Sequence, residues 1–127
     1  MRGRAEYTAA YRLFERALAL REKTLGTDHP DVAIDYNYLG TLLKDLGDLP
    51  NARIYFERVI TIDEKVYGID HPNIAIDYNN LGMLLQVMGD LPNARIYYDK
   101  ALKILIGKLG ENHPYTQQSQ EWLAGLT

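Results

Sequence analysis

The sequence of 127 residues contains no cysteine, which excludes disulfides and thiolate metal sites and gives no sign of an oxidising compartment. It also has no excess of basic residues. The formal net charge is -3 at pH 7, so a general attraction to nucleic acid or to anionic membranes is not expected. No apolar run approaches the roughly 20 residues of a membrane span, and the N-terminus lacks the apolar core of a signal peptide. These absences predict a soluble, cytoplasmic protein without nucleic-acid or membrane partners.

The chain does contain a strong internal repeat. His29, His71 and His113 are each followed by proline, at spacings of 71 − 29 = 42 and 113 − 71 = 42 residues. The segment GDLPNARIY also occurs unchanged at 47–55 and 89–97. A fixed period of this length indicates a tandem array of structural units.

Each unit is predicted to be a helical hairpin. A proline (Pro30, Pro72) suits the first turn of one helix, and a nearby aspartate (Asp28, Asp70) is available to satisfy its free N–H groups or to interact with the positive end of the helix. Gly47 is expected to end that helix in the left-handed conformation. Apolar residues recur at helical spacing in both helices of the first unit: Ala33, Tyr36, Leu39, Gly40, Leu43 and Leu46, then Ala52, Tyr55, Phe56, Val59, Ile60 and Val66. No segment alternates as a half-buried strand does, so the fold class is all-α.

The pattern Tyr36-x2-Leu39-Gly40-x2-Leu43, followed by Gly47, Ala52, Phe56 and Val59, resembles the tetratricopeptide repeat (TPR). The longer period and the N-x-LG run are similar to the variant found in kinesin light chains. This resemblance implies a right-handed superhelical solenoid of antiparallel helix pairs. It predicts six helices in a single array over 1–127: an orphan second helix at 5–25, full repeats at 26–67 and 68–109, and a terminal first helix at 110–127.

The two full repeats differ mainly along one helical stripe. From Ala33 to Leu43 the only differences from the second repeat are Tyr38/Asn80 and Thr41/Met83, and Lys44/Gln86 and Asp45/Val87 follow. Packing positions repeat because the packing repeats, whereas a surface that contacts an asymmetric ligand need not; free drift of exposed positions is the alternative. The stripe, which the first helices would present on a concave groove, comprises Ile34, Asn37, Tyr38, Thr41, Lys44, Asp45, Ile76, Asn79, Asn80, Met83, Gln86 and Val87.

These residues predict a protein–protein interaction scaffold or adaptor that binds an extended peptide. Asn37 and Asn79 each carry a donor and an acceptor that suit a peptide backbone, and the resemblance implies the same role for the asparagine of N-x-LG. Both could instead bridge neighbouring helices. The alternative function is a structural or self-assembling segment of a larger protein, with a homo-oligomer formed through the terminal helices, where Tyr11, Phe14 and Leu18 would lack a covering helix.

An enzyme is not predicted. The sequence has no GxGxxG, P-loop, HExxH or GxSxG pattern. The three histidines occupy the same linker of successive repeats, too far apart to share a metal ion, so we expect them to be structural. The repeated aspartates Asp35, Asp77, Asp48 and Asp90 are interpreted as solvated helix edges. No catalytic residue, metal site or cofactor is expected.

Overall fold

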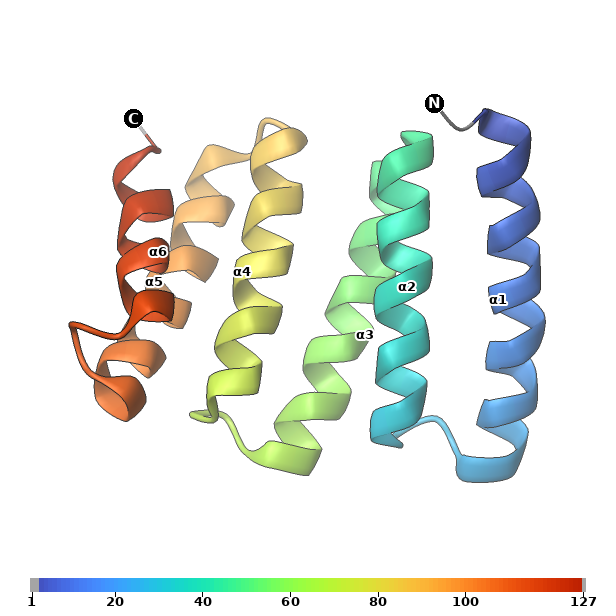
Figure 1. Ribbon diagram of the computed structural model, residues 1–127, viewed down its shortest axis with the longest axis horizontal. Helices are drawn as coiled ribbons and strands as arrows, with labels where there is room; N and C mark the ends of the chain where they lie inside the picture. The colour runs from blue at the N-terminus through green and yellow to red at the C-terminus, as the bar shows by residue number, and fades with distance from the viewer. Residues whose placement is uncertain (1–2, 127) are drawn as a thin grey trace. The chain divides into compact units, whose positions relative to one another are not determined.

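A computed structural model describes residues 3–126, and within that range the chain forms six α-helices and no strand (Figure 1). The all-α class predicted from the sequence is therefore confirmed. The chain divides into two compact units, Met1–Val66 and Tyr67–Thr127.

The first unit is built from α1 (Arg4–Leu25), α2 (Pro30–Leu46) and α3 (Leu49–Tyr67). Helices α1 and α2 lie side by side and run in opposite directions, as Figure 1 shows. The Arg4 guanidinium at the start of α1 accordingly donates a 2.9 Å hydrogen bond to the Leu46 carbonyl at the end of α2. Burial of apolar side chains from all three helices stabilises the unit, and these are Leu18, Val32, Ala33, Tyr36, Leu39, Val59 and Ile62.

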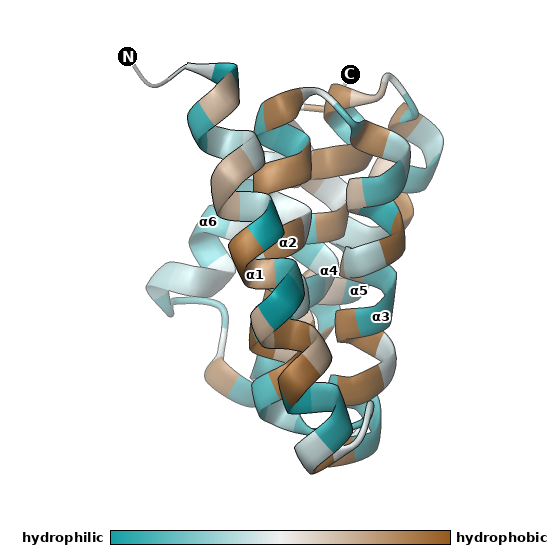
Figure 2. Cartoon of the chain, turned by 90° about the vertical axis from the view of Figure 1, so that its right-hand side faces the viewer, coloured by the Kyte–Doolittle hydropathy of each residue, from teal (hydrophilic) through white to brown (hydrophobic). Residues whose placement is uncertain are grey.

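The outer surface of α1 differs from the sequence prediction. Leu18 is buried, and Tyr11 and Phe14 are partly buried against the same core, so these three residues do not form an uncovered strip. The large apolar residues of α1 that are most exposed are Leu13 and Leu20, at 66% and 68%, followed by Leu25 at 41%. Figure 2 brings α1 to the front and shows hydrophobic segments on its outward side.

Helices α2 and α3 approach closely because Gly40 has no side chain. A Cβ atom at that position would lie 3.0 Å from Cε1 of Phe56. Gly47 ends α2 with φ +88°, as predicted, and its N–H group bonds the Lys44 carbonyl while Asp48 N–H bonds the Leu43 carbonyl. Val66 was placed in the apolar stripe of α3 but is 42% exposed, so that assignment is wrong.

The second unit consists of α4 (Pro72–Val87), α5 (Leu91–Leu109) and α6 (Pro114–Ala124). Helix α5 contacts both α4 and α6. Its buried residues are Ala94, Tyr98, Ala101 and Leu105. A Cβ atom at Gly82 of α4 would lie only 2.8 Å from Cε1 of Tyr98, so this pair of helices depends on the missing side chain.

Histidine, not aspartate, caps the helix that begins each repeat. The Nδ1 atoms of His29, His71 and His113 accept hydrogen bonds of 3.0, 3.0 and 3.1 Å from the N–H group two residues later. This satisfies one of the free donors of the helix end. The histidines thus take the capping bond that was expected of Asp28 and Asp70, whose carboxylates form ion pairs of 3.1 Å with Lys65 and 3.3 Å with Lys108. The structure thus gives the histidines a structural role.

Candidate functional site

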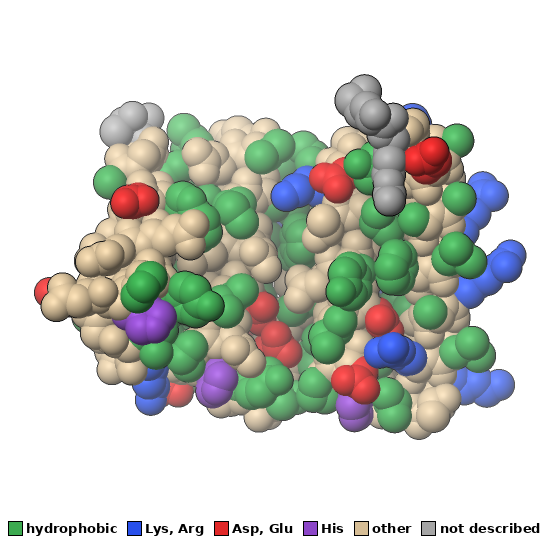
Figure 3. Space-filling view, in the orientation of Figure 1, with side chains coloured by type: hydrophobic (Ala, Val, Ile, Leu, Met, Phe, Trp, Pro, Cys, Tyr) green, Lys and Arg blue, Asp and Glu red, His purple; other side chains and the backbone are tan. Residues whose placement is uncertain are grey.

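The twelve residues of the predicted stripe differ in how far packing leaves them exposed. Seven are exposed: Ile34, Tyr38, Thr41, Asp45, Ile76, Gln86 and Val87. Four are half-buried: Asn37, Lys44, Asn80 and Met83. Asn79 alone is buried, with 7% of its surface exposed. Figure 3 shows that the surface over α4 and α6 of the second unit is mainly hydrophobic or uncharged.

In the first unit, the stripe residue Tyr38 is partly engaged by a neighbouring ring. Its ring stacks on Phe14 of α1, with a centroid distance of 5.4 Å and an interplanar angle of 12°. Tyr38 nevertheless remains 54% exposed. Thr41 donates a 2.8 Å hydrogen bond to the carbonyl of Asn37, which occupies its hydroxyl proton. The half-exposed Tyr38 ring therefore offers a pre-positioned aromatic surface.

In the second unit, three stripe residues line a pocket of about 240 Å³ between α4 and α6. Ile76, Asn79 and Asn80 form its α4 side. The remaining lining residues come from α5 and α6, and these are Leu105, Tyr115, Gln118 and Trp122. None of the seven side chains carries a charge.

The α6 residues of the pocket were not predicted as site residues, although the repeat contained a signal for two of them. Gln118 stands 118 − 76 = 42 residues after Ile76, and Trp122 stands 122 − 80 = 42 residues after Asn80. Extending the stripe by one period would have found both. Leu105 and Tyr115 enter the pocket only through the packing of α5 and α6, which the stripe does not encode.

The Asn79 side chain combines burial with an unused acceptor. Its Oδ1 atom is shielded from solvent and has no hydrogen-bond partner in the described part of the chain. A buried carbonyl oxygen without a donor costs about 1–3 kcal/mol relative to a paired one. Most buried polar atoms in folded proteins are paired, so this atom is an exception that calls for an explanation. Asn37, the equivalent residue in the first unit, is only half-buried.

A larger pocket, of about 420 Å³, lies in the first unit and contains no stripe residue. Its lining residues are Glu22, Thr27, Asp28, Tyr36, Arg58, Thr61 and Ile62. The Tyr36 hydroxyl donates a 2.8 Å hydrogen bond to Glu22, and burial together with this carboxylate raises the pKa of Tyr36 to about 12. Arg58 lies 5.6 Å from the Tyr36 ring centroid and Asp28 is paired with Lys65. The charged groups of this pocket therefore already interact within the protein.

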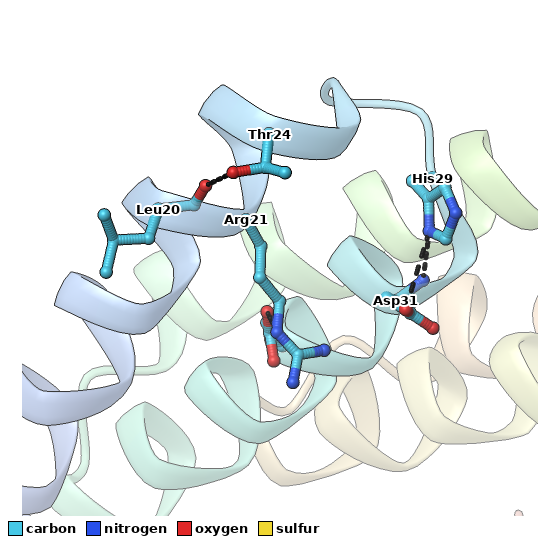
Figure 4. A network of polar contacts seen from close by, with 6 residues as sticks. Leu20, Arg21, Thr24, His29 and Asp31 are labelled. Atoms are coloured by element: carbon cyan, nitrogen blue, oxygen red, sulfur yellow. Dashed lines mark hydrogen bonds and ion pairs between the residues drawn. The ribbon is translucent and has the colours of Figure 1, made fainter.

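Two aspartates interpreted as solvated are in fact buried. Asp35 and Asp77 are each 6% exposed. Arg21 of α1 lies 3.5 Å from the Asp35 carboxylate. Burial nevertheless raises the pKa of Asp35, because desolvation of the carboxylate outweighs the opposing charge of Arg21. Figure 4 shows Arg21 together with the hydrogen bond that His29 accepts from the Asp31 N–H group at the start of α2. Asp48 and Asp90 are half-buried at helix edges, and their carboxylates accept hydrogen bonds from the first turns of α3 and α5.

Comparison with known proteins identifies the architecture. A family profile described as tetratricopeptide repeat matches residues 2–65 and 36–106, which together cover most of the chain. The chain belongs to the tetratricopeptide repeat family. The close contact between Gly40 and Phe56, repeated by Gly82 and Tyr98, is thus the helix-pair contact of a TPR unit in this chain.

Solved structures similar to this TPR chain include a Podosopora anserina protein described as a kinesin light chain with nearly identical TPR-like repeats. It is 25% identical, with a TM-score of 0.82, over 94% of this chain and 57% of that protein. BtubC (BKLC) from P. vanneervenii is 24% identical, with a TM-score of 0.80, over 95% of this chain and 48% of that protein. The chain therefore spans about half the length of these proteins. The similarity supports the TPR-like superhelical fold class.

Other comparisons add no assignment. No curated protein matches the chain. Among residues 3–126, no helix combines the length and apolar character that a membrane crossing requires. The same residues contain no group of three or more His, Asp or Glu side chains arranged to hold a metal ion.

Proposed function

We propose that this TPR chain is a non-enzymatic interaction module that binds an extended peptide segment of another protein along the first helix of each repeat. TPR repeats generally mediate protein–protein interaction, which supports a protein partner. The contact surface is the stripe on α2 and α4 defined above, extended in the second unit by the pocket residues of α6. A cytoplasmic adaptor or scaffold role accords with this proposal.

The observation that carries the proposal is the buried, unpartnered Asn79 oxygen beside the uncharged pocket. Leucine at this position would avoid the cost of an unpaired amide. An asparagine is useful if a ligand completes its hydrogen bonds, because its amide offers both a donor and an acceptor to a peptide backbone. Asn37 offers the same groups in the first unit.

Selection from a random peptide library displayed on phage tests the proposal. The wild type should enrich a family of peptides, whereas the Asn37→Ala/Asn79→Ala double variant should bind them about tenfold or more weakly, since each lost hydrogen bond is worth on the order of 1 kcal/mol. Thr61→Ala, on the exposed surface of α3 outside the stripe, is the matched control and should retain full affinity. Equal affinity of the double variant and the wild type would contradict the proposed site.

A second candidate function, self-association, is favoured by the exposed surface of α1. Leu13 and Leu20 are seven positions apart and therefore lie on the same side of the helix. Both are about two-thirds exposed, and exposed apolar residues so placed favour contact with a second copy of the same surface. We propose that this surface forms a weak dimer contact independent of the peptide site.

A further inference from the structure

The pocket between α4 and α6 has the size and chemistry to select one side chain of the bound peptide. Resting on the proposed peptide-binding function, we propose that it accepts a single large apolar, uncharged side chain and rejects acidic and basic ones. Its volume of about 240 Å³ is below the roughly 300–1,000 Å³ of small-molecule sites, which fits one side chain better than a cofactor. The peptide residue that enters this pocket is called the anchor residue below.

The apolar walls of the pocket are held in place before any ligand binds. Leu105 is 1% exposed and cannot move without disturbing the core. Trp122 packs against Tyr98 at a centroid distance of 6.2 Å, and the Tyr98 hydroxyl is fixed by a 3.0 Å hydrogen bond to Gln86. Ile76 is 45% exposed and so keeps apolar surface available to an incoming side chain. A preformed apolar wall binds a ligand without the entropic cost of ordering its side chains.

The polar groups of the pocket suit a main chain and not a charged side chain. They are the three amides of Asn79, Asn80 and Gln118 and the Tyr115 hydroxyl, all neutral. A carboxylate or an ammonium group entering the pocket would lose its hydration without meeting an opposite charge. Neutral amides can instead bond the N–H and C=O groups on either side of the anchor residue.

The Asn79 oxygen indicates where the protein would form a hydrogen bond to the backbone of the anchor residue. This oxygen is covered in the free protein, so its amide must turn about χ2 to meet a ligand N–H group. That torsion has a broad, shallow preference in asparagine, and the turn is therefore easy. The ligand N–H would supply the hydrogen bond that the free protein lacks. Binding of the anchor residue would therefore also remove the cost of the unpaired Asn79 oxygen.

The first unit differs from the second at one position of the stripe. Tyr38 stands where the second repeat has Asn80, and its ring stacks on Phe14. None of the stripe residues on α2 lines the large pocket of that unit, which contains Glu22, Asp28 and Arg58. Selection of the anchor residue therefore belongs to the second unit.

The test measures the preference of the pocket directly. Peptides enriched by the wild type from the library are resynthesised with Leu, Phe, Ala, Asp or Lys at each position in turn. Binding is followed through the fluorescence of Trp122, the single tryptophan of the chain, and its protection from acrylamide. One position should prefer Leu or Phe over Asp or Lys by at least about tenfold, and occupancy by Leu or Phe should shield Trp122.

A substitution that adds a charge at the pocket should change which anchor residue it prefers. Gln118→Lys places a cation at the pocket on an exposed position that does not support the core, and it should raise the affinity for an Asp anchor about tenfold relative to a Leu anchor. Gln120→Lys is the matched control, because it makes the same change of charge at an exposed position of α6 outside the pocket. It should leave the anchor preference unchanged.

Asn79→Leu separates a binding role from a packing role. Leucine removes the unpaired oxygen, so this variant should unfold at higher urea concentration than the wild type and yet bind every selected peptide about tenfold more weakly. A stabilised variant with unchanged affinity would overturn the role of Asn79.

The outcomes also separate this inference from the proposed function. If no peptide binds the wild type, both are wrong. If peptides bind and depend on the two asparagines, but no position prefers an apolar residue and Gln118→Lys behaves as Gln120→Lys does, the anchor pocket is wrong and the peptide-binding function stands.

Discussion

The substitution Gly82→Ala probes the tightest helix contact of the chain. Alanine is favoured over glycine inside a helix by about 0.5–1 kcal/mol, so without a neighbour the substitution would stabilise the protein. The new Cβ, however, would lie 2.8 and 2.9 Å from Cε1 and Cδ1 of Tyr98. Carbon atoms in contact are normally about 3.5–4.0 Å apart, so the ring must move by roughly 0.7 Å.

Tyr98 has little freedom to make that movement. It is 0% exposed, and its hydroxyl is bonded to Gln86 at 3.0 Å. Inserting a methyl group into such a packed contact costs about 1–3 kcal/mol. Subtracting the helix-propensity gain leaves an expected destabilisation of about 1 kcal/mol for Gly82→Ala.

Two other glycines provide the comparison. Gly107 of α5 has no atom within 4 Å of an added Cβ, so Gly107→Ala should stabilise by about 0.5 kcal/mol. A Cβ atom at position 40 would lie 3.0 Å from the ring of Phe56. This ring has no hydroxyl group to hold it in place, so Gly40→Ala should leave the free energy of unfolding almost unchanged. Urea unfolding followed by circular dichroism gives the three values. If Gly82→Ala were as stable as Gly107→Ala, the argument that the Tyr98 contact controls this helix pair would be refuted.

Three further predictions concern the caps, the buried charge and the α1 surface. His71→Ala should lower stability by about 1 kcal/mol in urea unfolding, and His71→Asn, which restores a capping oxygen, should recover most of it. Because burial raises the folded-state pKa of Asp35, this residue should add to the free energy of unfolding at low pH, and the contribution should be lost as pH rises from about 3.9 through the raised value. Asp35→Asn should remove this pH dependence. Identical profiles of stability against pH for the wild type and the variant would contradict the prediction. Leu13→Glu/Leu20→Glu should shift sedimentation toward the monomer at micromolar concentration without loss of helix content, whereas a wild type that is already monomeric would exclude the dimer.

Features set by neighbouring residues in the chain were predictable from the sequence. Helix α2 ends at Gly47 as predicted, because capping is local, and Gly47 adopts φ +88° through its own lack of a side chain. The cap by the histidine of each His-Pro pair is equally local, although we expected an aspartate in that role. The 42-residue period could be read directly because the same packing demands the same residues twice. Family membership and the all-α class follow from these local and periodic signals.

Features set by contacts between helices required the tertiary structure. Burial of Asp35 beside Arg21 joins residues of α1 and α2 whose pairing no motif specifies. Asn37 and Asn79 occupy the same position of the repeat, yet only Asn79 is buried with an unpaired oxygen, because burial depends on the surrounding side chains and not on the residue's own identity. The uncharged pocket likewise exists only where α6 brings Tyr115 and Trp122 to α4, since a pocket is a property of the packing between helices.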